Sequence, residues 1–193
     1  MIILAYKQQG VVYLATDTRL IFGSRKESRA NEPSSKLRVL DNGIVVGVAT
    51  HNYEWRKAVL DHPEIFTLTK GGDLTHRHIV TKIIPALFDL SKEGDHLQKD
   101  SDRALTDGDL VLAYRNKLFY INAGFWAIEC ERWLNAGTYA FGVGHLAQID
   151  KSRDIEEQLI AALKASERYS TWIGGPFVTV NTRDLVYQVK EVD

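Results

Sequence analysis

The sequence predicts an α/β chain of the α+β kind, arranged as a four-layer α/β/β/α sandwich. Three observations support this fold class. Runs of β-branched and aromatic residues occur in pairs around turn residues, amphipathic stretches separate groups of such runs, and the order is strands, two helices, strands, a helix and two strands. Strand groups that bury one face on each other leave their outer faces to helices. At 193 residues the chain is long enough to bury a sizeable core, so we expect one domain over residues 1–193.

Paired strands are predicted for the first fifty residues. Turn residues separate the members of each pair, Gln8-Gln9-Gly10 in the first and Asp41-Asn42-Gly43 in the second, and Asn-Gly is a strong hairpin signal. The predicted strands are Ile2–Tyr6, Val11–Thr16, Lys36–Leu40 and Ile44–Ala49, with a further strand edge over Leu20–Ser24. The polar residues 24–35 are predicted to form a loop. A sheet covered on both faces can bury both sets of side chains, and we expect burial of Val12, Leu14, Val45 and Val48.

Helical patterns follow these strands. Asn52 is a suitable N-cap for a helix that runs through Leu60 and ends before Pro63. Asp73 is a suitable N-cap for a longer helix to about Ser91, which Pro85 should bend because proline lacks a backbone donor. The apolar stripe expected on this longer helix consists of Val80, Ile83, Ile84, Leu87 and Leu90.

The second half repeats the alternation. Residues 92–109 are polar and charged and are predicted to form a linker. A capping box at Asp154-Ile155-Glu156-Glu157 opens a helix. Its buried stripe should be Ile155, Leu159, Ala162 and Leu163. The predicted strands are Leu110–Tyr114, Lys117–Ile121, Phe125–Ile128, Tyr139–Val143, Phe177–Val180 and Leu185–Val189.

Composition narrows the class of function. The net charge of -1 gives no basic field for nucleic acid, and no apolar stretch approaches the ~20 residues that cross a bilayer. One cysteine, Cys130, and the lack of a signal-peptide pattern lead us to expect a cytoplasmic protein. His76 and His78 point to different faces of a predicted helix, so we expect no metal site and no cofactor.

Two clusters have structural interpretations. Aromatic residues in the second half, Trp126, Trp133 and Trp172 among them, are typical of a core or of an oligomer interface. A small basic cluster, Arg25, Lys26 and Arg29, is expected to be a solvated loop face or a contact between subunits.

Four segments resemble the mature β-subunit of the proteasome, a member of the N-terminal nucleophile hydrolase superfamily. They are Thr16-Asp17-Thr18-Arg19, Ser35-Lys36-Leu37, Gly142-Val143-Gly144 and Gly174-Gly175. In that family the first residue of the mature chain is a threonine nucleophile and its α-amine is the base. The resemblance implies a site formed by Met1, Asp17, Arg19 and Lys36, in which Asp17 and Lys36 are neighbours near the start of the first strand.

The same resemblance exposes four departures from the family pattern. Met1 replaces the threonine, Val143 a serine and Thr50 the glycine that lines the oxyanion hole, and Tyr169 or Ser170 replaces an aspartate. A thioether has no proton to lose and does not attack an amide carbonyl. The resemblance therefore implies a vestigial site without threonine-type proteolysis.

Three functions remain open at this point. The first is a non-catalytic, self-associating subunit that forms a ring or part of a larger assembly. The second is an active amide or peptide hydrolase with an unidentified nucleophile, and the third is a ligand-binding module that uses the vacated cleft. Residues 144–154 are shorter than their family counterpart, which carries a full helix that helps rings to stack, so we expect stacked rings to be lost.

Overall fold

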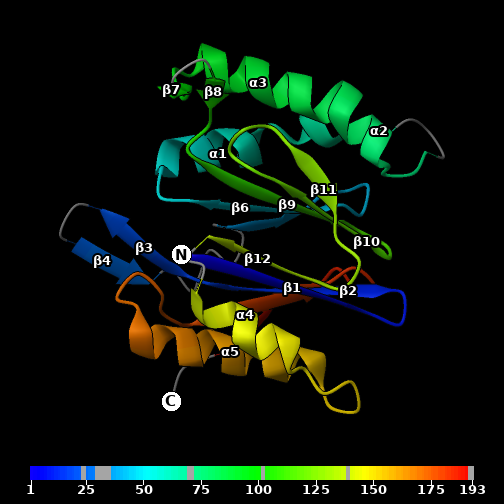
Figure 1. The fold of residues 1–193 in the computed structure, drawn as a ribbon, viewed down its shortest axis with the longest axis vertical. Helices are drawn as coiled ribbons and strands as arrows, with labels where there is room; N and C mark the ends of the chain where they lie inside the picture. The colour runs from blue at the N-terminus through cyan, green and yellow to red at the C-terminus, as the bar shows by residue number, and fades with distance from the viewer. Residues whose placement is uncertain (23–24, 29–35, 69–71, 101–102, 138–139, 191–193) are drawn as a thin grey trace.

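Two antiparallel sheets face each other between two helical layers in a computed structural model of the chain (Figure 1). The structure describes residues 1–22, 25–28, 36–68, 72–100, 103–137 and 140–190. The predicted four-layer α/β/β/α sandwich is confirmed. Among the described residues, no helix is long and apolar enough to cross a membrane.

The first sheet has the strand order β12-β1-β2-β13-β14. Its centre is the predicted N-terminal hairpin, in which Gln8 pairs with Val11 across a two-residue turn. Gln9 and Gly10 both have positive φ there, which matches the twist of the flanking strands. The strands are β1 (Ile2–Gln8), β2 (Val11–Asp17), β12 (Trp133–Gly137), β13 (Phe177–Asn181) and β14 (Gln188–Lys190).

The second sheet has the order β11-β10-β9-β6-β5. Gly43 has a φ of 83° in the turn that joins its first two strands, so the Asn-Gly hairpin is also confirmed. The strands are β5 (Leu37–Val39), β6 (Val45–Thr50), β9 (Gly108–Tyr114), β10 (Lys117–Ile121) and β11 (Ala127–Glu129).

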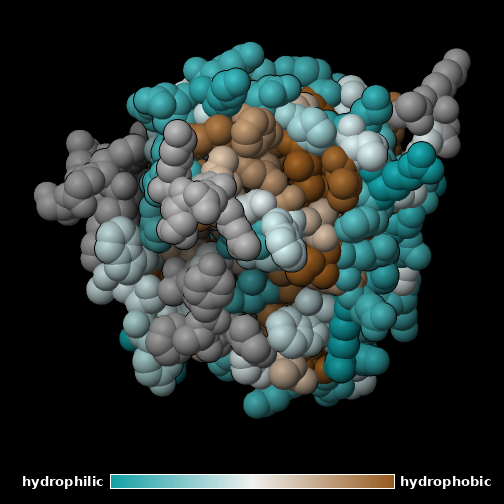
Figure 2. All heavy atoms as spheres, turned by 45° about the horizontal axis from the view of Figure 1, so that its top comes forward, coloured by the Kyte–Doolittle hydropathy of each residue, from teal (hydrophilic) through white to brown (hydrophobic). Residues whose placement is uncertain are grey.

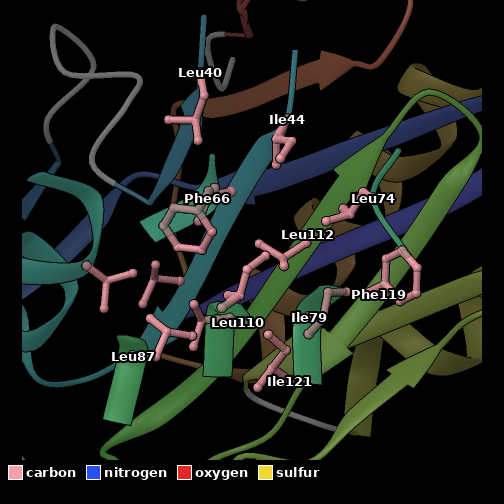
Figure 3. Close-up of a cluster of buried hydrophobic side chains, with 14 of the residues drawn as sticks. Leu40, Ile44, Phe66, Leu74, Ile79, Leu87, Leu110, Leu112, Phe119 and Ile121 are labelled. Atoms are coloured by element: carbon pink, nitrogen blue, oxygen red, sulfur yellow. The ribbon is translucent and has the colours of Figure 1, made fainter. Parts of the chain in front are cut away.

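Side-chain alternation divides the core into layers. Val12, Leu14 and Val45 lie between the two sheets. Val48 points the other way, into the cluster between the second sheet and its helices (Figure 3). All four are fully buried, as predicted. Gly47 lets the sheets approach, because a Cβ there would lie 3.0 Å from the Ile3 Cδ1 atom.

Helices close both outer faces. The second sheet is covered by α1 (Tyr53–Asp61), the 3₁₀ turn η2 (Pro63–Phe66), α2 (His76–His78), the π-helical η3 (Ile79–Ile83) and α3 (Ile84–Glu93). The first sheet is covered by α4 (Ala140–Ala147) and α5 (Ile155–Tyr169). Two of the three predicted caps are present, since the side chains of Asn52 and Asp154 accept the backbone N–H groups of Trp55 and Glu157. The predicted stripe of α5 is buried.

The predicted long helix is wrong in two respects. Its N-cap is Thr75, whereas Asp73 pairs with Lys117. A π turn precedes Pro85, with the Ile84 N–H donating to the carbonyl of Ile79 five residues back. This wider turn shifts the helical phase, so Ile79 faces the core and Val80 is exposed.

Several other elements differ from the sequence prediction. The expected linker contains the hairpin of β7 (Gln98–Asp100) and β8 (Arg103–Leu105). The expected loop at residues 24–35 contains β4 (Arg25–Ser28), which pairs with β3 (Arg19–Phe22), while residues 24 and 29–35 lie outside the described part. The strands of these two hairpins are only three or four residues long and contain charged residues, so their sequences do not show the alternation of apolar residues that predicts a strand.

The region after residue 130 departs most from the prediction. β12 was not predicted, and the strand expected over Tyr139–Val143 is wrong because α4 begins at Ala140. The helix expected to be missing before Asp154 is therefore present, displaced toward the N-terminus and short. Two strands also start later than predicted, β11 at Ala127 and β14 at Gln188.

Candidate functional site

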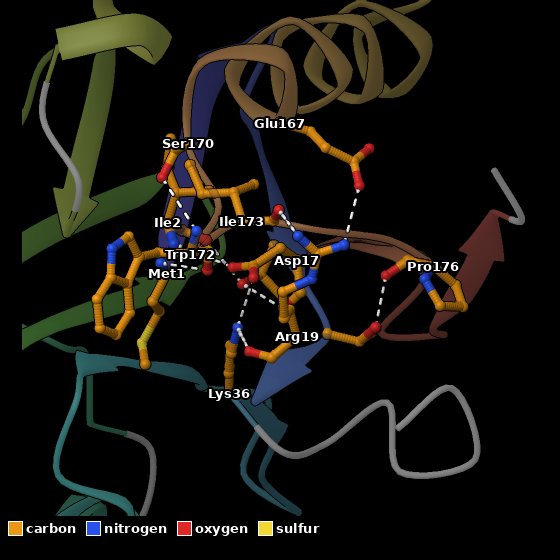
Figure 4. A network of polar contacts seen from close by, with 12 residues as sticks. Met1, Ile2, Asp17, Arg19, Lys36, Glu167, Ser170, Trp172, Ile173 and Pro176 are labelled. Carbon is orange, nitrogen blue, oxygen red and sulfur yellow. Dashed lines mark hydrogen bonds and ion pairs between the residues drawn. The ribbon is translucent and has the colours of Figure 1, made fainter. Parts of the chain in front are cut away.

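Met1, Asp17, Arg19 and Lys36 meet at one end of the sandwich (Figure 4). Met1 precedes β1, Asp17 ends β2, Arg19 begins β3 and Lys36 precedes β5. Because β1 and β2 are antiparallel, the start of one strand lies beside the end of the other, and the sheet register alone brings Met1 and Asp17 together.

Asp17 and Lys36 form a fully buried ion pair, which confirms the predicted proximity. The Lys36 Nζ atom lies 2.8 Å from the Asp17 Oδ2 atom and donates to the Arg19 carbonyl, also at 2.8 Å. The Ile2 N–H donates to Asp17 Oδ1 at 3.0 Å. Burial lowers the pKa of Lys36 from 10.5 to about 8, and the Asp17 charge opposes that shift.

The α-amine of Met1 lies beside this pair and donates to the Trp172 carbonyl at 3.0 Å. Burial lowers the pKa of this amine from 8.0 to about 6. Asp17 opposes the shift, whereas the charges of Lys36, Arg19 and Arg56 add to it. At neutral pH the amine is therefore mostly uncharged, the form in which it can take up a proton.

The Met1 side chain turns inward and ends against a backbone donor. Thr50 donates its backbone N–H to the Met1 Sδ atom at 3.0 Å, and the Arg56 Nη1 atom lies 4.0 Å from the same sulfur. A thioether is a weak acceptor. The amide at the position that resemblance assigns to the oxyanion hole is thus already occupied by sulfur.

Arg19 positions the turn that receives the Met1 amine. Its guanidinium donates to the Ile173 carbonyl at 2.7 Å and pairs with Glu167 at 3.3 Å. A Cβ on Gly174 would overlap this guanidinium, so the glycine makes the contact possible. Arg19 therefore acts on the site through the chain segment that carries Trp172.

The other positions that depart from the family pattern are Val143 and Tyr169 or Ser170, and they lie in different surroundings. Ser170 lies in the turn beside Met1, where its hydroxyl accepts the Trp172 N–H at 3.2 Å, while Tyr169 is exposed. The backbone of Val143 lies within α4, and its side chain is outside the described part.

Hydroxyl groups near Met1 are engaged with the backbone. Thr16 donates to the Ile2 carbonyl, Thr18 to the Pro176 carbonyl and Thr50 to the Asp107 carbonyl. A nucleophilic hydroxyl needs a base as its proton acceptor, and these three have carbonyl acceptors instead.

A cavity of about 450 Å³ opens next to Met1, with Thr50, His51 and Asp107 in its wall. The His51 ring packs edge-on against Trp172, with 5.2 Å between the ring centroids. Burial lowers the pKa of His51, and the Met1 amine and Lys36 lower it further. Size and lining suit a small organic molecule.

Sequence reasoning missed Arg56, and it noted Trp172 only as an aromatic residue. The sequence did offer one signal that Arg56 is buried. It lies three residues before Val59 and four before Leu60, on the same face of the helix as these two buried residues. The role of Trp172 depends on its backbone carbonyl, for which side-chain chemistry gives no signal. The His76 and His78 rings contact different carbonyls, those of Ala127 and Thr67.

No protein-family model matches the chain, and no curated protein matches its sequence. Solved structures do match. BPH from Thiobacillus denitrificans is 20% identical with a TM-score of 0.74, covering 94% of this chain and 97% of that one. Anbu from Hyphomicrobium sp. strain MC1 is 16% identical with a TM-score of 0.72, covering 100% and 88%.

A third match is the helical assembly of the Anbu complex from Pseudomonas aeruginosa, which is 12% identical with a TM-score of 0.68, covering 100% and 86%. Anbu from another organism is described as an ancestral β-subunit. Structural similarity at these low identities extends over nearly the whole of each chain. The chain therefore has the proteasome-like fold of the N-terminal nucleophile hydrolases, in a divergent form.

Proposed function

We propose that this chain is a non-catalytic, self-associating subunit of the proteasome-like type, with residues 1–193 acting as one domain. The observation that carries the proposal is the position of the Met1 sulfur. It lies beside the buried Asp17–Lys36 pair, where a nucleophile would be needed, and it accepts the Thr50 N–H.

Parts of a catalytic site remain around this sulfur. The uncharged Met1 amine could serve as a base, and Lys36 supplies a nearby positive charge. The group to be activated is missing, because a thioether carries no ionisable proton. The sulfur also occupies the Thr50 N–H, and loss of one oxyanion donor alone costs ~10²–10³ in rate.

Surface chemistry supports self-association. Phe88 and Trp126 line a second cavity, of about 800 Å³, and Ile128 lies two residues further along the same segment. Trp126 is 66% exposed and Ile128 54%. Figure 2 shows hydrophobic residues at the surface, bordered by hydrophilic ones. Such patches are typical of interaction sites, and the neighbouring Anbu structure from Pseudomonas is itself an assembly.

The test for catalysis uses the full chain with its N-terminal residue verified by intact mass. We expect no turnover of fluorogenic peptides and no adduct with a threonine-directed covalent inhibitor, under conditions in which an active proteasome gives both. Turnover, or an adduct on Met1, would replace this proposal by the hydrolase alternative.

The test for assembly is the mass of the chain in solution. Sedimentation at micromolar concentration should show an oligomer, and a closed ring should give one discrete mass because cyclic symmetry limits growth. A pure monomer would contradict self-association and would point to a component that depends on a different partner.

A further inference from the structure

Arg56 is a buried arginine that no carboxylate of the described residues pairs with. It lies on the inner face of α1 and is 2% exposed. Its recorded contacts are the Tyr53 ring, 5.2 Å from the guanidinium carbon to the ring centroid, and the Met1 sulfur. Within the described ranges, no Asp or Glu forms an ion pair with it. A guanidinium has five N–H donors and no acceptor, so this side chain lacks the anion that burial normally requires.

Neighbouring charges do not supply that anion. Asp17 is paired with Lys36, and Glu167 is paired with Arg19. Asp107 and Asp109 lie in the wall of the Met1 cavity, and among the described residues neither forms an ion pair with Arg56. Burial lowers the pKa of Arg56, and Tyr53 and Asp17 oppose the shift. The Arg56 guanidinium is therefore buried next to Met1 with no described carboxylate paired to it.

The Met1 side chain separates Arg56 from the cavity. Its sulfur accepts the Thr50 N–H and lies 4.0 Å from the nearest guanidinium nitrogen of Arg56. Met1 and Thr50 also line the cavity wall. Methionine has three rotatable bonds and adapts readily to a new packing arrangement. If the Met1 side chain moved, the neutral Thr50 N–H and the charged Arg56 guanidinium would both face the space that the sulfur had occupied.

We propose that the Met1 cavity binds a small molecule with a single carboxylate, which displaces the Met1 thioether and pairs with Arg56 and the Thr50 N–H. A carboxylate accepts charge-assisted hydrogen bonds, which are about twice as strong as neutral ones, whereas sulfur accepts weakly. Two carboxylates also lie in the wall, where Asp107 accepts from Asn52 and Gln98 and Asp109 accepts the Ala123 N–H, so a ligand with further negative charges is disfavoured there. Ala49 and Ala123 in the wall suit an apolar body.

The test exploits the single methionine of the chain. A [methyl-¹³C]methionine label gives one NMR signal, from Met1 itself. We expect benzoate to shift this signal in a saturable way, and benzamide, its neutral counterpart, to bind at least about tenfold more weakly. The readout is independent of peptidase activity and of oligomer mass, so it can fail while the proposed function stands.

Two variants assign the binding to Arg56. Arg56→Leu should weaken benzoate binding at least about tenfold, since a charged hydrogen bond is lost while Met1 stays the only labelled methionine. Arg132→Leu is the matched control, because Arg132 also lies over an aromatic ring, that of Tyr6, but is exposed and remote from the cavity. It should bind benzoate within about twofold of the unmodified chain, because it removes no donor from the cavity.

Three results would overturn the proposal: no shift of the Met1 methyl signal up to about 20 mM benzoate, equal binding of benzamide, or unchanged binding to Arg56→Leu. If Arg56→Leu does not fold, the contrast between benzoate and benzamide on the unmodified chain decides the question alone.

Discussion

The buried Asp17–Lys36 pair makes contacts that give it a structural role. Asp17 accepts the Ile2 N–H at the start of β1, and Lys36 donates to the Arg19 carbonyl at the start of β3. The pair thus connects the ends of four strands, since Asp17 ends β2 and Lys36 directly precedes β5.

Removing one member of the pair should be costly. Lys36→Met leaves the Asp17 carboxylate buried without a cation, and we expect the free energy of unfolding to fall by about 3–5 kcal/mol. The double variant Asp17→Asn/Lys36→Met should lose less than the two single variants combined. Lys57→Met, which removes an exposed partner of Asp61, should change stability by at most about 0.5 kcal/mol in the same urea titrations. Equal effects of Lys36→Met and Lys57→Met would contradict the buried-pair assignment.

The Met1 amine should titrate below the usual range for an α-amine. Competitive acylation across pH 4–9 should show its reactivity rising with pH and inflecting near pH 6, where an ordinary amine inflects near 8. Between these values the unfolded chain binds more protons than the folded chain, so this group makes the free energy of unfolding rise with pH. An inflection at pH 8 in the folded chain would show that the amine is solvated.

At the level of elements, features that depend on local signals were predicted better from the sequence than features that depend on long-range pairing. Both tight turns and the caps at Asn52 and Asp154 were predicted correctly because they depend on residues within a few positions of each other, whereas the cap predicted at Asp73 lies at Thr75 instead. The π turn η3 and the strand β12 were not predicted. β12 exists through its pairing with β1, whose residues lie more than a hundred positions earlier in the chain.

The Asn52 cap gives a test of such a local signal. Asn52→Ala removes the acceptor of the Trp55 N–H, and we expect a loss of about 1 kcal/mol in the free energy of unfolding. Asn52→Ser keeps a capping oxygen and places no second carboxylate against Asp107, to which Asn52 donates, so it should recover part of that loss. Thermal denaturation of both variants measures the difference, and equal Tm values for Asn52→Ala and Asn52→Ser would show that the cap contributes nothing.

In the molecule as a whole, each sheet buries both of its faces, one against the other sheet and one against helices. Interior packing is thereby completed within the chain, and the apolar side chains left at the surface are candidates for contact with another subunit. Phe88, Trp126 and Ile128 form one such group, and Val186 lies elsewhere, just before β14.

Because these two exposed apolar sites lie apart, variants at each can test which one is used for self-association. We expect Trp126→Glu/Ile128→Glu to shift the sedimentation distribution toward monomer, because charges in an apolar interface are desolvated without partners. Val186→Glu is the matched control, since Val186 is 63% exposed, and it should leave the distribution unchanged. The reverse pattern would place the interface at the β14 edge instead.

The sequence alone predicted the sandwich, both hairpins, two helix caps and the meeting of Asp17 with Lys36. The sandwich, the hairpins and the caps follow from residue period and turn chemistry, which lie along the chain, whereas the meeting of Asp17 with Lys36 was implied by the resemblance to the proteasome β-subunit. It also identified Met1 as lacking a nucleophile, since that conclusion needs only the chemistry of one side chain.

The remaining features were decided by the tertiary structure. The Trp172 carbonyl receives the Met1 amine across 171 positions, and the Thr50 N–H meets the Met1 sulfur across 49. Neither partner carries a side-chain signal for its role, because the groups that act are backbone atoms. Among the described residues, no carboxylate pairs with Arg56, because the fold places Asp17 against Lys36 instead. Whether a charge has a partner depends on distances between side chains in the folded state, and these distances are set by the packing of the two sheets.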